Sequence, residues 1–195
     1  MIFAEKFSPT LSTLKLLTLI LTIPPLLTAC STTPQNTSSK ASSKNLYLVS
    51  HPPKSTLTKI DALLPATMKW YDNVAKSLYH KGRVLTAIEK KQAKQLGVRN
   101  PNTVRVVILD KFPEPNGRFS NDHSEGARAM GDIIMLKPHL KNNSMVLCHE
   151  LVHVAQKDRL GLRGFLKQIA LEKEILGYSG SLLENEAYAL QQTIQ

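Results

Sequence analysis

The sequence is poor in cysteine. Among its 195 residues only Cys30 and Cys148 occur, so at most one disulfide bond can form within the chain. Exported domains that depend on disulfide bonds usually carry several cysteines. We therefore expect a domain that is held together by its apolar core, helped by a metal ion if one binds. Internal repeats are absent as well.

The sequence also lacks an apolar run long enough for a membrane-spanning helix. Its most apolar stretch runs from Leu16 to Leu27, follows two lysines and is interrupted by two prolines. A basic start, a short apolar run and a small residue before the cleavage point are typical of a signal peptide. The following Leu-Thr-Ala-Cys ends at Cys30 and is similar to the lipobox of bacterial lipoproteins, whose cysteine is acylated.

These features predict three regions. Residues 1–29 form a lipoprotein signal peptide, and residues 30–45 hold the lipidated Cys30 and a disordered tether with no apolar residue larger than alanine. Residues 46–195 form a single folded domain. Ser31 follows the cysteine where an aspartate would favour retention at the inner membrane. We therefore expect a lipid-anchored protein of the bacterial cell envelope, on the outer membrane and facing the periplasm.

Acidic residues are outnumbered by basic ones. The chain has 15 acidic and 25 basic residues, for a formal net charge of +10. A basic balance can indicate nucleic-acid binding. Here the basic residues are scattered along the chain, and an exported lipoprotein rarely meets nucleic acid. We expect no nucleic-acid partner, and a basic surface that is solvated or attracted to anionic headgroups and cell-wall polymers.

One stretch carries a recognisable chemical pattern. Residues 149–153 read His-Glu-Leu-Val-His, which fits H-E-x-x-H, and the surrounding region has no proline or glycine from Ser144 to Gln156. A helix is expected there, so the two histidines share one face and can bind one metal ion. Glu150 lies beside them, where it can act as a general base on a metal-activated water.

Hydrophobic periodicity predicts the other elements. Before the motif we expect a short strand or extended lead-in at residues 46–49 and helices between Leu57 and Leu96, with a new start at Pro65 and a break at Lys81. We then expect a strand over 104–109, a loop over 112–129 and a strand over 131–138. Pro138 ends this last strand and suggests that it lies at a sheet edge. After the motif helix we expect a helix over 165–176, a break over 177–180 and a last helix capped by Ser181. Helices, a small sheet and more helices predict an α+β domain.

A catalytic zinc ion usually has three protein ligands, and the third is not obvious. An astacin-like pattern would continue with a glycine and a histidine, but Gln156 and Arg159 occupy those positions. A peptide-deformylase-like site would need a cysteine well upstream of the motif, and none lies between Cys30 and Cys148. A later helical segment offers two glutamates, Glu184 and Glu186.

With these motifs the sequence resembles the gluzincin metallopeptidases, the thermolysin-like clan that combines H-E-x-x-H with a distal glutamate. The stretch from Glu184 to Tyr188, Glu-Asn-Glu-Ala-Tyr, is similar to the E-x-x-A-[DN] signature, whose first glutamate binds zinc. The resemblance implies one zinc ion bound by His149, His153 and Glu184. Tyr188 stands where an aspartate or asparagine would orient a ligand histidine, so the looser N-E-x-x-A form keeps Glu186 as an alternate ligand.

The resemblance also implies a fold and an activity. The fold would be a small zincin-like domain with a short mixed sheet, an active-site helix and a following helix that bears the glutamate. The activity would be hydrolysis of peptide bonds in a peptide or protein substrate, with Glu150 as general base, a strand like residues 131–138 as the substrate's edge strand, and Tyr178, Tyr188 or His123 as oxyanion donor. A non-catalytic binding or assembly factor of the cell envelope and a cell-wall amidase remain as alternatives.

Overall fold

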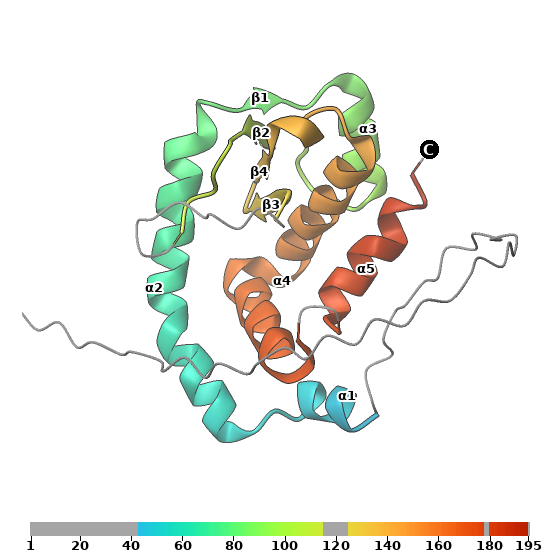
Figure 1. The fold of residues 1–195 in the computed structure, drawn as a ribbon. Helices are drawn as coiled ribbons and strands as arrows, with labels where there is room; N and C mark the ends of the chain where they lie inside the picture. Colours follow the sequence, from blue (N-terminus) through green and yellow to red (C-terminus); the bar gives the residue numbers. More distant parts are fainter. Residues whose placement is uncertain (1–42, 115–124, 178–179, 195) are drawn as a thin grey trace, which may run out of the picture. The chain divides into compact units, whose positions relative to one another are not determined.

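A computed structural model describes residues 43–114, 125–177 and 180–194 of the chain. These residues form an α+β domain, as the sequence predicts, with helices around a four-stranded mixed sheet (Figure 1). The elements are α1 (Ser43–Ser50), α2 (Lys54–Tyr79), β1 (Arg83–Val84), α3 (Ala87–Gln95), β2 (Arg105–Ile108), β3 (Ala127–Met130), β4 (Ile133–Leu136), a short 3-10 helix η1 (Pro138–Leu140), α4 (Ser144–Leu176) and α5 (Leu182–Gln191). Within this described part no helix is long and apolar enough to cross a membrane. The predicted signal peptide, Cys30 and the tether up to residue 42 lie outside it.

The sheet has the strand order β1-β2-β4-β3. β4 pairs with β2 in parallel, with Ile134 opposite Val106, and with β3 in antiparallel, with Ile134 opposite Ala129. The prediction that residues 131–138 form an edge strand is therefore wrong. All four residues of β4 are buried, as expected for a strand covered on both faces. Pro138 follows the strand in η1, where it does not interrupt pairing.

The strand at the edge next to β4 is β3 instead. It occupies the end of the region that was predicted to be a loop up to Ala129. Ala129 and Met130 are buried on the sheet, while Ala127 and Arg128 are half-buried. The strand has only four residues, and a run this short carries little periodicity for a sequence-based assignment.

The two faces of the sheet bury two parts of the core. Alternate residues of a strand point to opposite faces, so Ile134 and Leu136 belong to one cluster and Ile133 and Met135 to the other. The first cluster includes residues of α3 and of the beginning of α4, namely Ala93, Leu147, Leu151 and Val154. The second includes residues of α2 and of the end of α4, namely Ile60, Leu64, Val74, Leu166 and Leu171. α4 therefore contributes to both parts of the core.

Two predictions near the start of the domain are wrong. Residues 46–49 lie in helix α1, which contacts α4, and Pro65 lies inside the continuous helix α2. A short apolar run does not distinguish a strand from a helix. Pro65 is exposed whereas Ile60, Leu64 and Tyr71 are buried, so the backbone groups that proline leaves unpaired face water while the buried side packs on the core.

The predicted break at Lys81 is confirmed, and it leads into β1 and then α3. Val84 and Leu85, which were assigned to a helix, precede α3 instead. α3 begins with a capping box: the side chain of Thr86 accepts a hydrogen bond from the N–H of Glu89 at 3.2 Å, and Glu89 accepts one from the N–H of Thr86 at 2.7 Å. This local pair fixes the start of the helix after Thr86 rather than before Val84.

α4 consists of two helical parts joined at Gly161. The helix begins at Ser144, as predicted, with the side chain of Asn143 accepting from the N–H of Val146 at 3.1 Å. It includes the second predicted helix over 165–176, and the two parts meet at a non-helical residue, Gly161, with φ 71° and ψ 158°. The kink separates the part that carries the H-E-x-x-H motif from the part that follows.

Replacing Gly161 with alanine should lower the free energy of unfolding by about 1–3 kcal/mol, because a side chain is strained at this φ. No atom lies within 4 Å of an added Cβ, so strain rather than a clash would be the cause. Gly164→Ala is the matched control: the residue is helical, the added Cβ would make an ordinary 3.5 Å contact with Leu160, and a gain of up to about 1 kcal/mol is expected. Urea denaturation measures both variants, and equal effects would contradict the prediction.

Candidate metal centre

The H-E-x-x-H motif lies in the buried first part of α4. Leu151, Val152 and Val154 are almost fully buried in the core, which fixes the helix on that side. His149 and His153 follow each other by one helical turn on the side that faces α5, and both are less than a tenth exposed. The packing of the apolar residues therefore determines where the two imidazoles point.

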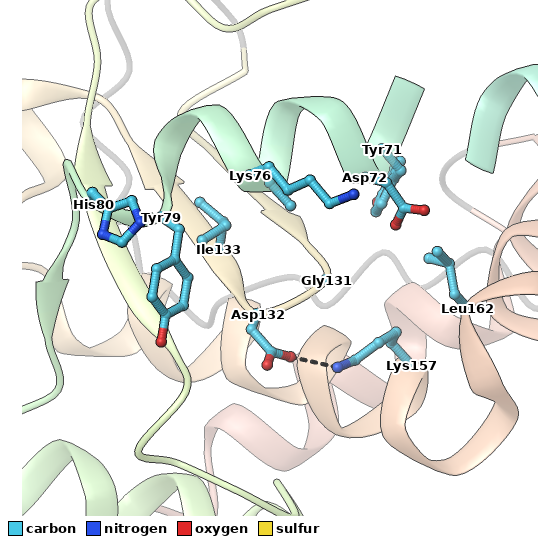
Figure 2. Close-up of a pocket in the computed structure, with 11 residues that line it drawn as sticks. Tyr71, Asp72, Lys76, Tyr79, His80, Gly131, Asp132, Ile133, Lys157 and Leu162 are labelled. Carbon is cyan, nitrogen blue, oxygen red and sulfur yellow. Dashed lines mark hydrogen bonds and ion pairs between the residues drawn. The ribbon is translucent and has the colours of Figure 1, made fainter. Parts of the chain in front are cut away.

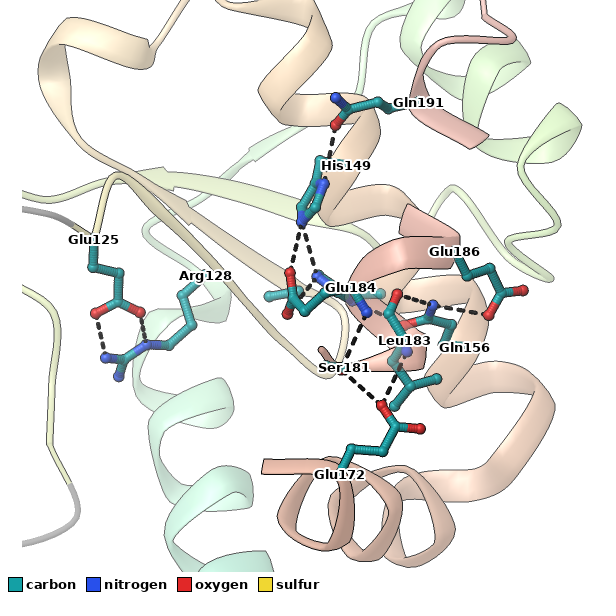
Figure 3. Close-up of polar contacts among 12 residues, drawn as sticks. Glu125, Arg128, His149, Gln156, Glu172, Ser181, Leu183, Glu184, Glu186 and Gln191 are labelled. Carbon is teal, nitrogen blue, oxygen red and sulfur yellow. Dashed lines mark hydrogen bonds and ion pairs between the residues drawn. The ribbon is translucent and has the colours of Figure 1, made fainter. Parts of the chain in front are cut away.

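The two histidines meet the carboxylate of Glu184, which lies in the first turn of α5. Figure 3 shows His149 pointing towards Glu184. The Nε2 atoms of His149 and His153 are 3.2 Å apart, and the two oxygens of Glu184 lie 3.3 Å and 3.5 Å from them. Two ligands of a tetrahedral zinc ion lie about 3.3–3.6 Å apart, given bonds of about 2.0–2.2 Å. The three side chains could therefore hold a metal ion.

The amide of Gln156 determines which nitrogen of His153 is available. Its Nε2 donates to the carbonyl oxygen of Leu183 at 2.9 Å and to Glu186 at 3.0 Å, so its oxygen faces Nδ1 of His153 at 2.9 Å. That oxygen can only accept, so the proton of His153 lies on Nδ1 and the lone pair lies on Nε2. Gln156 thus holds His153 in the tautomer that a metal ion requires.

Gln191 orients the other histidine, His149, in the same way. Its Oε1 lies 3.0 Å from Nδ1 of His149, which orients Nε2 towards Glu184. The gluzincin pattern would place an aspartate or asparagine for this purpose at position 188, where this chain has Tyr188. The ring of Tyr188 instead lies against the ring of His149, with centroids 4.6 Å apart. An amide one helical turn later on α5 makes the contact that Tyr188 cannot make.

Glu186, the alternate ligand, faces away from the histidines. Its carboxylate binds both terminal nitrogens of Arg159, at 2.7 Å and 2.8 Å, and accepts from Gln156. The hydrogen bond with Arg159 holds the pKa of Glu186 below its usual range. Of the two candidate glutamates, the fold brings Glu184 to the histidines and leaves Glu186 in an ion pair at the surface.

The two histidines differ in their tendency to bind a proton. Burial works to lower the pKa of His149, but the hydrogen bond with Glu184 and the nearby Glu150 raise it above its usual range. At His153 burial prevails, and its pKa lies below the usual range. Without a cation, the Nε2 lone pairs of the two histidines and the carboxylate of Glu184 face one another, and a proton on Nε2 of His149 would relieve their repulsion. A metal ion and this proton therefore compete for the same position.

Glu150 is 5 % exposed and lies beside the three side chains without joining them. Burial raises its pKa to about 7, and Glu184 adds to the rise, while His149 and a hydrogen bond from the backbone N–H of Ala129 oppose it. Its Oε2 atom is buried and, among the described residues, has no hydrogen-bond partner. A buried carboxylate oxygen of this kind requires a donor from water or from a ligand.

A cleft of about 360 Å³ opens next to Glu150 and His149. One side is formed by Gly126 and by Ala127, the first residue of β3, and another by Tyr188 of α5. The rest of the lining comes mainly from η1 and the start of α4, namely Leu140, Asn143, Met145 and Val146. Tyr188 is thus the candidate oxyanion donor that the fold brings to the cleft. Tyr178 and His123, the other two candidates, lie outside the described residues.

A second pocket, of about 470 Å³, lies between α2, the turn from β3 to β4, and α4 (Figure 2). On its floor Lys157 binds Asp132 at 2.5 Å, which ties this turn to the helix that carries the motif. Tyr71 lines the pocket and donates its hydroxyl to the carbonyl oxygen of Ala129 at 3.0 Å. None of the three metal-ligand candidates lines this pocket.

The contacts of Gln156 and Gln191 with the histidines were not predicted from the sequence. Gln156 follows His153 by three residues on the same helix, so its contact could have been found from helical spacing alone. Gln191 could not have been found in this way, because its contact with His149 depends on how α5 packs against α4.

Comparison of the chain with protein-family models, with curated proteins and with solved structures gave no match. The function proposed below is therefore based on the motif, on the geometry of the three side chains and on the cleft beside them.

Proposed function

We propose that the protein is a zinc-dependent peptidase of the bacterial cell envelope. The observation that carries this proposal is the convergence of two imidazole nitrogens and one carboxylate within 3.5 Å, next to a buried carboxylate oxygen without a protein partner in the described residues. The first three groups suit a metal ion, and the fourth suits a general base.

Zinc fits this donor set better than magnesium or calcium. Two imidazole nitrogens and one carboxylate oxygen at tetrahedral spacing are the ligands of many catalytic zinc sites, whereas magnesium and calcium prefer oxygen ligands. When bound, zinc would polarise a substrate carbonyl and make a water molecule more acidic. Gln156 and Gln191 keep both imidazoles aligned by binding Nδ1, so little reorganisation is needed.

Glu150 is the proposed general base. It follows His149 directly and lines the cleft, and its buried Oε2 can accept the proton of an attacking water and pass it to the leaving nitrogen. The N–H of Ala129 holds the carboxyl group in place. Tyr188 lies at the mouth of the same cleft, 49 % exposed, where its hydroxyl could stabilise negative charge on the substrate oxygen.

The cleft suits an extended peptide. A peptide can bind by adding backbone hydrogen bonds to an edge strand, and β3 is an edge strand of the described sheet. At Ala129 the outward-facing backbone groups already bind Tyr71 and Glu150. Peptide pairing is therefore expected at Ala127, which lines the cleft, rather than along the whole strand.

The test is to measure metal content and hydrolysis of the full-length chain. We expect about one zinc ion per chain and release of peptides from casein that stops when a chelator removes the metal. Release of stem peptides from purified cell wall without cleavage of casein would indicate an amidase instead. A chain that binds zinc but cleaves neither substrate would be a binding or assembly factor, and a chain without zinc would refute the proposal.

The location is proposed from the sequence alone. Leu-Thr-Ala-Cys at the end of the apolar run suggests lipid on Cys30, and Ser31 suggests the outer membrane, facing the periplasm. Cys30→Ala should abolish incorporation of a labelled fatty acid, because the thiol is the acylated atom. Cys148→Ala is the control, since that cysteine is buried in the core. Normal labelling of Cys30→Ala would show that the protein is not a lipoprotein.

A further inference from the structure

The start of α5 is held by two side chains of α4 that lie on opposite sides of the kink. Glu172, after the kink, accepts a hydrogen bond from the N–H of Leu183 at 3.0 Å and from the hydroxyl of Ser181 at 2.7 Å (Figure 3). Gln156, before the kink, donates to the carbonyl oxygen of Leu183 at 2.9 Å. Both backbone polar groups of Leu183 are thus bound by α4, and the next residue is Glu184.

Glu172 is a buried carboxylate, and burying a charged group costs free energy. It is 1 % exposed, and no cationic side chain of the described residues forms an ion pair with it. Its second oxygen accepts from the side chain of Gln168 at 2.7 Å, so three donors surround it. Burying a carboxylate is unfavourable unless donors surround it, and an apolar side chain would fill such a place at lower cost. A requirement for its hydrogen bonds explains why a side chain with an acceptor oxygen, rather than an apolar one, stands here.

The hydrogen bonds of Glu172 are required to hold Glu184 in position. The hydroxyl of Ser181, bound to Glu172, is also the N-cap that accepts from the N–H of Glu184 at 3.3 Å. Glu184 lies two residues after the first residue of α5, in a turn whose backbone would otherwise fray. A ligand on a fraying turn loses affinity, because binding must then order the turn.

We propose that Glu172 is a positioning residue of the metal centre. It fixes the first turn of α5, so that Glu184 meets His149 and His153 before any ion arrives. The inference is based on the proposed metal site and adds that metal affinity depends on a residue that does not touch the ion.

The experiment compares four forms of the full-length chain: wild type, Glu172→Ala, Glu172→Gln and Glu174→Ala. Glu174 is the matched control, because it lies two residues away on α4 but is exposed and pairs only at 3.5 Å with Lys59. Zinc affinity is measured by competition with a chromophoric chelator, the ligand set by the visible absorption of bound Co²⁺, and stability by the thermal midpoint of the metal-free protein.

Glu172→Ala should weaken zinc binding by about 10- to 100-fold, the usual effect of removing a group that orients a ligand. The Co²⁺ spectrum should change as well, because Glu184 is no longer held towards the ion. Glu172→Gln keeps an oxygen that can accept from Ser181 and Leu183, so its affinity should stay within about threefold of wild type. Glu174→Ala should match wild type.

Several outcomes would overturn the inference. If Glu172→Ala lowers the thermal midpoint but binds zinc and Co²⁺ like wild type, Glu172 supports the fold alone, and the proposed function survives. If Glu172→Ala does not fold, Glu172→Asp replaces it: its shorter side chain cannot reach both donors, and unchanged zinc affinity would overturn the inference. If wild type binds no zinc, the proposed function fails first and this inference fails with it.

Discussion

Glu150→Gln should keep its zinc and lose at least about 99 % of its hydrolytic activity. The glutamine keeps the size of the side chain and can still accept from the N–H of Ala129, but its amide cannot take a proton from water. None of the three metal-ligand candidates is changed, so the ion should stay. The loss should fall on kcat rather than on KM, because proton transfer belongs to the reaction and not to substrate binding.

Three measurements on Glu150→Gln make this result decisive: zinc content, kcat and KM. Glu174→Gln, an exposed change on the same helix, is the control and should match wild type. Activity of Glu150→Gln within a few-fold of wild type would show that Glu150 is not the base. Simultaneous loss of zinc would show instead that Glu150 supports the metal site, which its position beside His149 but outside the ligand group does not predict.

Glu184→Ala should lose zinc and activity together, whereas Glu186→Ala should keep both. One oxygen of Glu184 lies 3.3 Å from His149 and the other 3.5 Å from His153. Removing this anionic ligand is expected to weaken zinc binding by at least about 100-fold. Glu186 binds Arg159 and Gln156, and Gln156 keeps its hydrogen bond to Leu183 without it. A loss of less than about tenfold is expected there.

The two alanine variants are matched, because they differ by two positions on one helix and remove the same group. Zinc affinity and hydrolysis are measured for both, with His149→Ala and His153→Ala as variants that should lose the ion outright. Should Glu186→Ala lose zinc while Glu184→Ala keeps it, the ligand is Glu186 and α5 must rotate on binding. Zinc bound normally by both would place the third ligand elsewhere and refute the centre as described.

Local sequence was enough for the elements whose signals are local. The motif helix has a continuous run of helix-compatible residues without proline or glycine, so its place followed from the sequence. The cap of α5 by Ser181 followed from residue type at the helix start, and the side chain of Ser181 does accept from the N–H of Glu184. The α+β class followed from the order of these elements.

Pairing and packing were not local and were mispredicted. Pro138 suggested an edge for residues 131–138, but β4 is flanked by β2 and β3, because the partners of a strand come from distant parts of the chain. Pro65 suggested a helix start, but α2 packs on the core on both sides of it and continues. In each case tertiary contacts outweighed a single-residue preference.

The sequence by itself determined that two imidazoles and a carboxyl group lie on one helix, because helical spacing puts them there whatever the rest of the chain does. For the remaining ligand it left two candidates, Glu184 as the favoured one and Glu186 as the alternate. Two positions on a helix differ by about 200°, so α5 can present only one of them to the histidines. The packing of α5 against α4 determines which one it is. Glu172 and Gln156 bind the backbone of Leu183, and Arg159 binds Glu186. Glu184 therefore faces His149 and His153.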